Sequence, residues 1–440
     1  MNYTYFVDIT SWYFIVFMVS MFLGTAVSSF IDWLNSDKGD IRSKLNKLRE
    51  IDPVSNALFT YGRIRKSLEY KRVSESFSDM VGIIKSGMST IFTIFGIIPF
   101  TISLFMHFFP NIGTVWCWIM TACVSMILST AIFMLPDYYK TFSIEERFGF
   151  NKTTKKTFFS DTVKGLLVGI AMLIPLQFIF DLILKYVHDK NCVGIVSFVV
   201  FLISFGYVFR WFCMYVVMPM FNKFNPLENE SLKNKLMNLC DKCGLKNVSI
   251  EVMDASRRSK HSNAFIFGIF GKKRIVIFDN MLETMTEDEI VSVVAHEIGH
   301  GKLHHLAFKN IQGVFSVTAV TFIVFSLMKI PSFYNAFGYS WVNEANITDN
   351  MIIGFSIASA FITSFMWVLS PIANWISRKM EYAADRYACS VIENPKTLST
   401  ALLKLYSSNL SDIFPHPVYE FFNYSHPSVL NRIRKILEWK

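Results

Sequence analysis

The sequence predicts a mainly α-helical membrane protein with seven spanning helices and a cytosolic-side metal-binding domain that contains a small β-sheet. Three observations support this fold class. Of the 440 residues, 52% are hydrophobic and 16% aromatic, more than a soluble domain carries. Seven apolar stretches reach about 20 residues, the length that a helix needs to cross a bilayer. A short pattern of histidines and a glutamate, typical of a metal site, lies between two of these stretches.

The seven apolar stretches are predicted to be helices, because a chain in hydrocarbon must satisfy its own backbone hydrogen bonds. They cover residues 12–31, 87–109, 115–135, 165–187, 194–221, 311–330 and 351–375. No fixed-period repeat interrupts them, so a solenoid is not expected.

Lys and Arg predict the orientation of these helices, because short cytosolic loops are rich in both. The basic segments are 32–79, 136–164 and 222–310. Segments 110–114 and 331–350 contain neither Lys nor Arg. Seven crossings with a lumenal N-terminus and a cytosolic C-terminus put every basic segment in the cytosol. Cleavage of the first stretch as a signal peptide would put them all in the lumen, so we expect it to remain as an anchor.

Charge and cysteine content argue against other classes of protein. The net charge of +9 is explained by orientation and by attraction to anionic lipid, so we expect no nucleic-acid partner. The seven cysteines are scattered and do not suggest a disulfide framework. Cys240 and Cys243 form a lone CxxC pair, which we interpret as two half-buried thiols.

The segment between the fifth and sixth stretches contains the pattern HEIGH, residues 296–300. It follows Thr286 and a run of acidic residues, which are typical of the start of a helix. Residues four apart share one face of a helix, so His296 and His300 can bind one zinc ion. Glu297 can then act as the general base for a metal-bound water that attacks a peptide carbonyl. The alternative is a cytosolic helix with two surface histidines.

A third metal ligand is expected where the seventh stretch continues into the cytosol. Glu381 can complete a His-His-Glu site that leaves one position open for water. Asp385, one turn further on, can orient a histidine or donate a proton to the leaving amine. A surface ion pair between Arg378 and Glu381 is the alternative, since such pairs are common on helices.

A small sheet is predicted just before the metal-binding helix. Short β-rich runs cover 248–252, 264–269 and 274–278. If residues 263–269 form an edge strand that faces the metal, free backbone groups can align a substrate in extended form. An ordinary hairpin is the alternative.

The two polar pieces of the chain are expected to combine into one protease domain. Residues 1–221 then hold five membrane helices with their loops, 222–310 the sheet and the HExxH helix, 311–377 the last two membrane helices, and 378–440 the helix with the glutamate ligand and the C-terminal segment.

Five sequence motifs occur in order along nearly the whole chain. They are EERFGFNK at 145–152, MDASRRSKHSNAF at 253–265 with KRIVIFD at 273–279, HEIGH at 296–300, SRKMEYAAD at 377–385 and SHP at 425–427. In these motifs the chain resembles the type I CAAX prenyl proteases, the a-factor-converting zinc metalloendopeptidases of the endoplasmic reticulum membrane.

This resemblance implies one catalytic zinc ion and a specific set of site residues. The metal ligands are His296, His300 and Glu381, the base is Glu297, the proton donor is Asp385, and the residues that contact the substrate carbonyl or stabilise the oxyanion are Asn263, His426 and Arg432. The family fold is a ring of seven helices around a water-filled intramembrane chamber, capped by the protease domain. Substrates are prenylated proteins ending in Cys-a-a-X, from which the last three residues are removed.

Two other functions stay open at this point. A quality-control metalloprotease for membrane proteins would use the same catalytic residues, whereas a seven-span transporter or scaffold would need none of them. From the resemblance we expect a monomer in the endoplasmic reticulum membrane, with the nuclear envelope as a second location.

Overall fold

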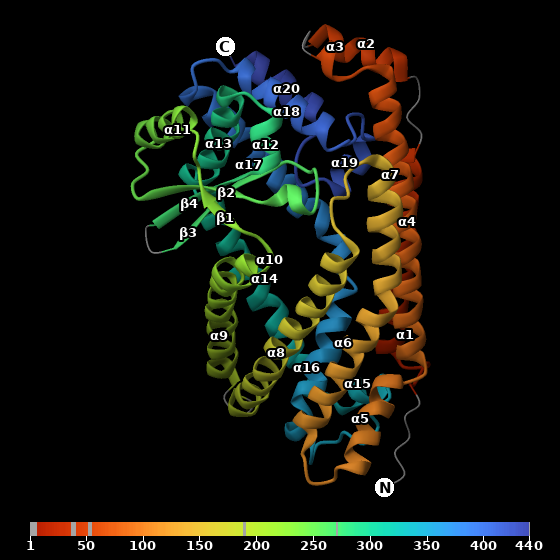
Figure 1. Cartoon of the computed structure of the whole chain (residues 1–440). Helices are drawn as coiled ribbons and strands as arrows, with labels where there is room; N and C mark the ends of the chain where they lie inside the picture. The colour runs from red at the N-terminus through yellow and green to blue at the C-terminus, as the bar shows by residue number, and fades with distance from the viewer. Residues whose placement is uncertain (1–6, 37–40, 52–54, 188–190, 270–271, 440) are drawn as a thin grey trace.

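The structure, a computed structural model, describes residues 7–36, 41–51, 55–187, 191–269 and 272–439. It is mainly helical and contains a small sheet, as predicted. Figure 1 shows two layers. Long helices form the lower layer, and shorter helices pack around the sheet in the upper layer. The start of α1 lies in the lower layer, and the last helix, α20, lies in the upper layer.

Long helices, most of them apolar, and their short extensions make up the lower layer. They are α1 (Trp12–Ser36), α4 (Tyr61–Ile94), α5 (Ile97–Phe108), α6 (Thr114–Tyr139), η1 (Lys140–Glu145), α7 (Glu146–Phe148), α8 (Lys155–Val187), α9 (Asn191–Phe212), η2 (Cys213–Val217), α10 (Met218–Phe221), α14 (His305–Leu327), α15 (Pro331–Ala336), η4 (Ile347–Asn350), α16 (Met351–Thr363) and η5 (Met366–Val368). Within the described ranges, six of the helical stretches are long and apolar enough to cross a membrane.

The second predicted span, 87–109, differs from the expectation because it is not one helix. Its first part ends α4, and its second part forms the shorter helix α5. Gly96 separates them with a φ of 57°, a left-handed conformation that glycine adopts without steric cost. The apolar residues of this crossing are therefore divided between two helices.

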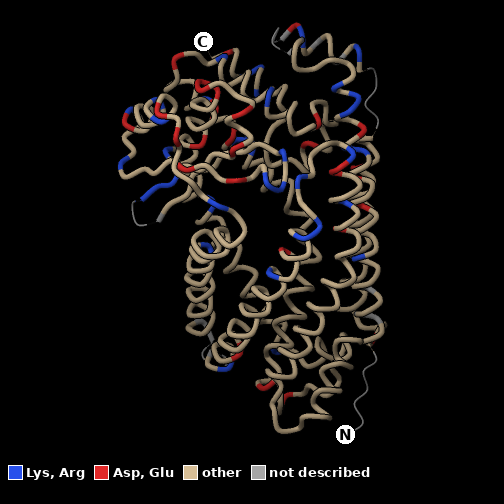
Figure 2. Tube along the Cα trace, viewed as in Figure 1, with Lys and Arg blue, Asp and Glu red and all other residues tan. Residues whose placement is uncertain are grey.

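The distribution of charge supports a membrane position for the lower layer. Figure 2 shows Lys, Arg, Asp and Glu concentrated in the upper layer, while the long helices below carry few of them. Only 11% to 33% of the residues in each spanning window are buried inside the protein. Side chains such as Phe22 and Leu135 are more than 70% exposed. Apolar surface of this extent requires lipid, so the chain is a multi-pass membrane protein.

The upper layer contains a four-stranded mixed sheet within the described part of the chain. Its strands are β1 (Phe224–Pro226), β2 (Val248–Met253), β3 (Ala264–Ile269) and β4 (Lys272–Phe278), in the order β1-β2-β4-β3. β2 and β4 are parallel, and the other pairs are antiparallel. The three predicted strands are confirmed, and β3 lies at an edge of the sheet, where no other strand of the described residues pairs with its second side.

The helices of the upper layer come from three parts of the chain. They are α2 (Ile41–Ile51), α3 (Ser55–Leu58), α11 (Glu230–Lys242), η3 (Ala255–Arg257), α12 (Asp279–Thr284), α13 (Glu287–Lys302), α17 (Ser370–Val391), α18 (Lys396–Ser408), α19 (Pro417–Asn423) and α20 (Val429–Glu438).

One hydrophobic core joins these helices to the sheet. Ile275 and Val294 from the first polar piece pack there with Leu403 and Ile433 from the second. Leu48, from the segment after α1, is also fully buried in this core. The two pieces therefore share one core, while the predicted boundaries of the four chain segments stay a prediction.

Candidate metal centre and catalytic cleft

Helix α13 begins where the sequence predicted. The Thr286 hydroxyl accepts a hydrogen bond from the Glu289 backbone, and the Glu289 carboxylate accepts one from the Thr286 backbone. This reciprocal cap satisfies two backbone donors that a helix start leaves free. Further along the helix, buried residues such as Val294 pack into the core. His296 and His300 lie on the face that meets α17.

A glycine sets the distance between these two helices. A Cβ atom on Gly299 would lie 3.1 Å from the Ala384 backbone oxygen and 3.2 Å from the Tyr387 ring. Both distances are short for a carbon contact, so α13 and α17 pack against each other at this point without a side chain between them. The close approach brings Glu381 of α17 to the two histidines.

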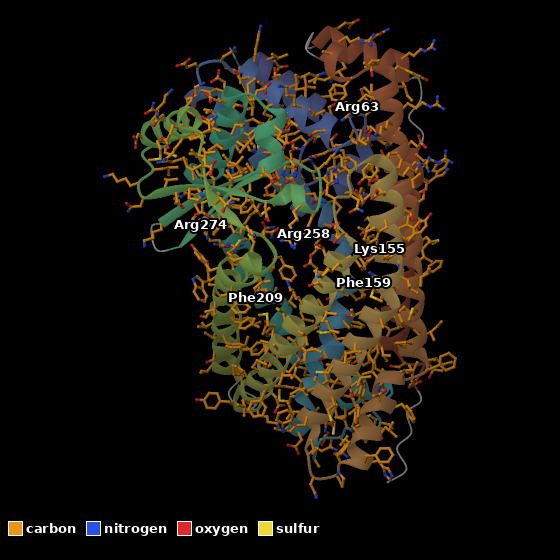
Figure 3. All side chains as sticks on the ribbon, in the orientation of Figure 1. Arg63, Lys155, Phe159, Phe209, Arg258 and Arg274 are labelled. Atoms are coloured by element: carbon orange, nitrogen blue, oxygen red, sulfur yellow. The ribbon has the colours of Figure 1, made fainter. Side chains whose placement is uncertain are left out.

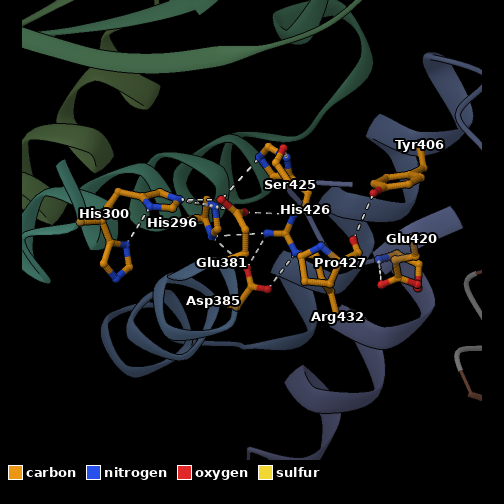
Figure 4. Close-up of polar contacts among 12 residues, drawn as sticks. His296, His300, Glu381, Asp385, Tyr406, Glu420, Ser425, His426, Pro427 and Arg432 are labelled. Carbon is orange, nitrogen blue, oxygen red and sulfur yellow. Dashed lines mark hydrogen bonds and ion pairs between the residues drawn. The ribbon is translucent and has the colours of Figure 1, made fainter. Parts of the chain in front are cut away.

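Three ligand atoms meet where α13 faces α17. Nε2 of His296 lies 3.3 Å from Oε2 of Glu381, and Nε2 of His300 lies 3.3 Å from Oε1 of the same carboxylate. The two Nε2 atoms are 3.2 Å apart. Figure 4 shows this cluster, in which the candidate ligand atoms all lie within 4.8 Å of one another. The predicted His-His-Glu set is therefore assembled.

The chemistry of this cluster fits a metal ion. Nδ1 of His296 is 2.9 Å from Oδ1 of Asp385, so Nδ1 holds a proton there, and the neutral imidazole that a metal binds presents its lone pair at Nε2. Oε2 of Glu381 is buried and has no hydrogen-bond partner among the described residues. Lone pairs of two imidazoles and a carboxylate repel one another unless a proton or a metal ion lies between them. Two nitrogens and one oxygen form the donor set of catalytic zinc sites.

Asp385 and Arg432 form a buried pair behind His296. Asp385 is 0% exposed, and its two oxygens accept hydrogen bonds from Nη2 and Nε of Arg432 at 2.6 and 2.8 Å. Burial alone would raise the pKa of Asp385, but the charge of Arg432 and these hydrogen bonds hold it below its ordinary value. Asp385 therefore stays ionised and keeps His296 in one orientation.

Arg378 does not pair with Glu381, so the surface ion-pair interpretation is wrong. Its Nη1 donates to the backbone oxygens of Glu420, Phe421 and Tyr424. Glu381 is instead only 5% exposed and points toward the histidines.

His305 was not singled out by the sequence analysis. Its Nδ1 lies 2.9 Å from Nδ1 of His300, and the residue is buried at the start of α14. If Nε2 of His300 binds a metal, its remaining proton lies on Nδ1 and is donated to His305. The sequence signal was the pair of histidines that follows HEIGH, but spacing alone does not tell which of the two turns back toward His300.

A cleft of about 490 Å³ contains the remaining predicted residues. Its walls include Asn263, which directly precedes β3, together with Glu297, His426 and Arg432. Nε2 of His426 lies 3.4 Å from Glu381, and the side chain is 61% exposed. Burial raises the pKa of Glu297 above its ordinary value. Of the predicted site residues, His296, Glu381 and these four line the cleft, whereas His300 and Asp385 do not line it and contact Glu381 and His296, respectively.

Comparison with known proteins identifies the family. Residues 226–440 match the model of Peptidase family M48, and residues 42–223 match the model described as CAAX prenyl protease N-terminal, five membrane helices. The chain belongs to the CAAX prenyl protease family. It is accordingly a metalloendopeptidase, which excludes the alternative of a non-catalytic transporter or scaffold.

Relatives of the chain span fungi and animals. CAAX prenyl protease 1 of Saccharomyces cerevisiae is 36% identical over 324 residues, which cover 70% of this chain and 69% of the yeast protein. The CAAX prenyl protease 1 homolog of Homo sapiens is 27% identical over 424 residues, covering 85% and 86% of the two chains. The crystal structure of S. mikatae Ste24p matches with a TM-score of 0.83 at 27% identity, over 97% of this chain and 99% of that one.

Proposed function

We propose that this CAAX prenyl protease is a zinc-dependent endoprotease that removes the C-terminal tripeptide of prenylated CAAX proteins. The observation that carries the proposal is the His-His-Glu cluster in a cleft whose wall includes Asn263, the residue directly before the edge strand β3. Its relatives are named for prenylated CAAX substrates. A prenyl chain contributes about 0.8 kcal/mol per buried methylene to membrane binding, so such substrates reach a membrane enzyme already at the bilayer.

His296, His300 and Glu381 would hold the zinc ion. When bound, zinc supplies Lewis acidity that polarises the scissile carbonyl and acidifies the attacking water. Glu297 lines the same cleft and accepts the proton of that water. Its raised pKa makes the carboxylate a stronger base than an exposed glutamate, and it can pass the proton on to the leaving amine.

For Asp385 and Arg432, the contacts support an orienting role. Both Asp385 oxygens are engaged and the residue is fully buried, so we assign it to hold His296, the first of the two predicted roles. Arg432 Nη1 lies 3.8 Å from Glu381 and adds positive charge beside the cleft. The His426 side chain is more exposed than that of Arg432, so we assign binding of the oxyanion to His426.

Substrate alignment is assigned to the β3 edge. A peptide that adds to this edge in extended form uses its backbone for affinity and presents its carbonyls in sequence. Asn263, at the start of the strand and in the wall of the cleft, is placed to contact the carbonyl next to the metal.

We further propose that the protein resides in the endoplasmic reticulum membrane with its protease domain in the cytosol. The basic segments support this orientation, because they would all face the cytosol. The low burial of the membrane helices fits a ring one helix thick around an open interior, since such a ring exposes both an outer and an inner face.

A purified, detergent-solubilised chain tests this function with three peptides of one sequence. These are a farnesylated CAAX peptide, its unmodified form, and a farnesylated peptide extended beyond the tripeptide. We expect mass spectrometry to find only the first cut, with release of the intact tripeptide, and cleavage to stop with chelator and return with zinc. Cleavage of unmodified membrane proteins without any cleavage of farnesylated peptide would support the quality-control function instead.

A further inference from the structure

The EERFGFNK motif occupies an unusual turn between the two layers. Helix α6 continues into the π-helix η1 and then into α7. A π-helix is rare and often marks a functional position. Gly149, with a φ of 84°, ends α7 and turns the chain toward the protease domain. The Lys260 backbone N–H then donates to the Phe150 backbone oxygen at 3.2 Å, and the Lys152 backbone N–H donates to the Arg258 backbone oxygen at 3.1 Å.

The motif thereby reaches the segment that leads into the edge strand β3. Asn151 forms a β-bridge with Ser259. Arg258 adds an ion pair of 3.0 Å with Asp161 of α8, and Figure 3 shows Arg258 at the border between the layers, above Phe159 of α8. Backbone and side-chain contacts therefore both connect the membrane helices to this segment.

Glu145, the last residue of η1, lies at the centre of these contacts. Its Oε1 accepts a hydrogen bond of 2.8 Å from the Tyr70 hydroxyl of α4. Its Oε2 lies 3.8 Å from Nε2 of His261. The His261 ring stacks on Phe150, with centroids 4.2 Å apart and an angle of 15° between the planes. One carboxylate therefore links two membrane helices to His261.

His261 passes this connection to the wall of the cleft. Its Nδ1 is 3.3 Å from Oδ1 of Asn409, at the end of α18. The same oxygen accepts the backbone N–H of Ser262 at 3.1 Å, and Nδ2 of Asn409 donates to the Ser262 backbone oxygen at 3.4 Å. Asn409 thus pairs with Ser262 as a neighbouring strand would. The next residue is Asn263.

Ser262 has a hydroxyl that the protein leaves unused. The residue is 5% exposed and lines the same cleft as Glu297, yet its Oγ has no hydrogen-bond partner in the part of the chain that the structure describes. A buried hydroxyl without a partner is destabilising unless a ligand or water satisfies it. Its position beside Asn263 makes the backbone of an extended peptide the fitting partner.

We propose that Glu145, His261 and Asn409 form a latch that holds Ser262 and Asn263 at the cleft, and that the Ser262 hydroxyl binds the substrate backbone. The three latch residues are positioning residues, because none of them touches the reacting atoms. Through them the membrane helices set how tightly the protease domain binds its substrate. The identity of the substrate rests on the proposed function, whereas the latch itself does not.

Steady-state kinetics with the farnesylated CAAX peptide test the latch in the full-length enzyme. For Glu145→Gln and His261→Ala we expect KM to rise about tenfold, the effect of losing one polar contact with a charged group. We expect kcat and zinc content to change less than about twofold. In the double variant the two effects should not add, since both break one chain of contacts. Ser262→Ala should likewise raise KM alone.

Glu146→Gln is the matched control. Glu146 is the adjacent residue, is exposed, and accepts a hydrogen bond from Asn151. Its kinetic constants should match those of the unaltered enzyme. An unchanged KM in both latch variants would overturn the proposal, and so would a fall in kcat together with loss of zinc. Fully additive effects in the double variant would overturn the common chain of contacts.

Hydrogen–deuterium exchange tests the latch without any substrate. We expect the amides of residues 258–264 to exchange faster in both latch variants, while the amides of the α13 core keep their protection. Because no peptide is used, this result stands even if prenylated peptides prove not to be substrates. Unchanged exchange of residues 258–264 would show that the contacts do not hold the segment.

Discussion

At the residue scale, the site depends on side chains that fix the two histidines. His296 is held by Asp385, and His300 by His305. Histidine ligands in proteins commonly donate their second ring proton to such a partner, which fixes the tautomer and the ring orientation. The metal-facing nitrogens are therefore set by residues that would not touch the metal.

His305→Ala is expected to lower zinc affinity by about 10-fold to 100-fold, the usual effect of losing a partner of a metal ligand. His304→Asn is the control, because His304 is the exposed neighbour and asparagine tolerates its left-handed φ of 54°. Competition with a fluorescent chelator measures both affinities. Equal affinities for the two variants would contradict the role of His305.

Asp385→Asn is expected to destabilise the fold by about 3–5 kcal/mol, since it leaves the charge of Arg432 buried without its partner. Chemical denaturation of the zinc-free protein in detergent measures the loss of stability. Fluorescence is used to follow the unfolding of the upper layer. A loss below about 1 kcal/mol, the size of a surface pair, would mean that the pair is not buried in solution.

Zinc affinity is expected to depend on pH through His296. Burial alone would lower the pKa of His296, but the carboxylates of Asp385 and Glu381 beside its ring raise it to about 9 in the metal-free protein. Zinc needs the neutral imidazole, so binding below that pH must release a proton. Apparent affinity should therefore rise by about tenfold per pH unit from pH 7 and level off near 9. Affinity that falls over this range, measured by titration calorimetry, would contradict this ionisation.

At the element scale, the crossing of α13 and α17 assembles the site. Gly299→Ala should push the helices apart and lower zinc affinity, because the new Cβ meets the Ala384 backbone. Gly301 lies two residues further along, and a Cβ atom there has only Nζ of Lys273 within 4 Å. The zinc affinity of Gly301→Ala should therefore stay unchanged. Zinc content after dialysis compares them. Equal zinc content would mean that the contact at Gly299 can relax without cost to the site.

At this scale, the sequence predicted the helices and strands whose signals lie within a few neighbouring residues. The cap of α13, the three longer strands and the HEIGH spacing are local patterns, and the structure has all of them. The break at Gly96 was missed, because apolar composition reports burial in lipid and not backbone continuity. β1 was missed because it has only three residues and is held by its pairing with β2.

The remaining parts of the site depend on contacts between distant segments. Whether Glu381 pairs with Arg378 or with His296 is decided by the packing of α17 against α13, which no pattern within α17 reveals. The packing of Leu48 in the core of the protease domain is of the same kind. The other four sequence motifs indicated that Glu381 is a metal ligand, but only through the resemblance to a family.

At the scale of the whole molecule, the two layers have different surfaces and different roles. The lower layer is apolar on its exposed surfaces, and the upper layer carries the charge and the metal cluster. The cleft belongs to the upper layer, while the Glu145 contacts connect it to the helices below. This arrangement suits a protease whose substrates carry a lipid in the bilayer and a peptide at its surface.

The most direct test of the central claim uses Glu297→Gln, which keeps the shape of the side chain and removes the base. The variant should bind one zinc ion with the affinity of the unaltered enzyme, bind farnesylated CAAX peptide, and cleave it at least about 100-fold more slowly. Cleavage of the peptide at the unaltered rate by the zinc-loaded variant would contradict the assigned mechanism.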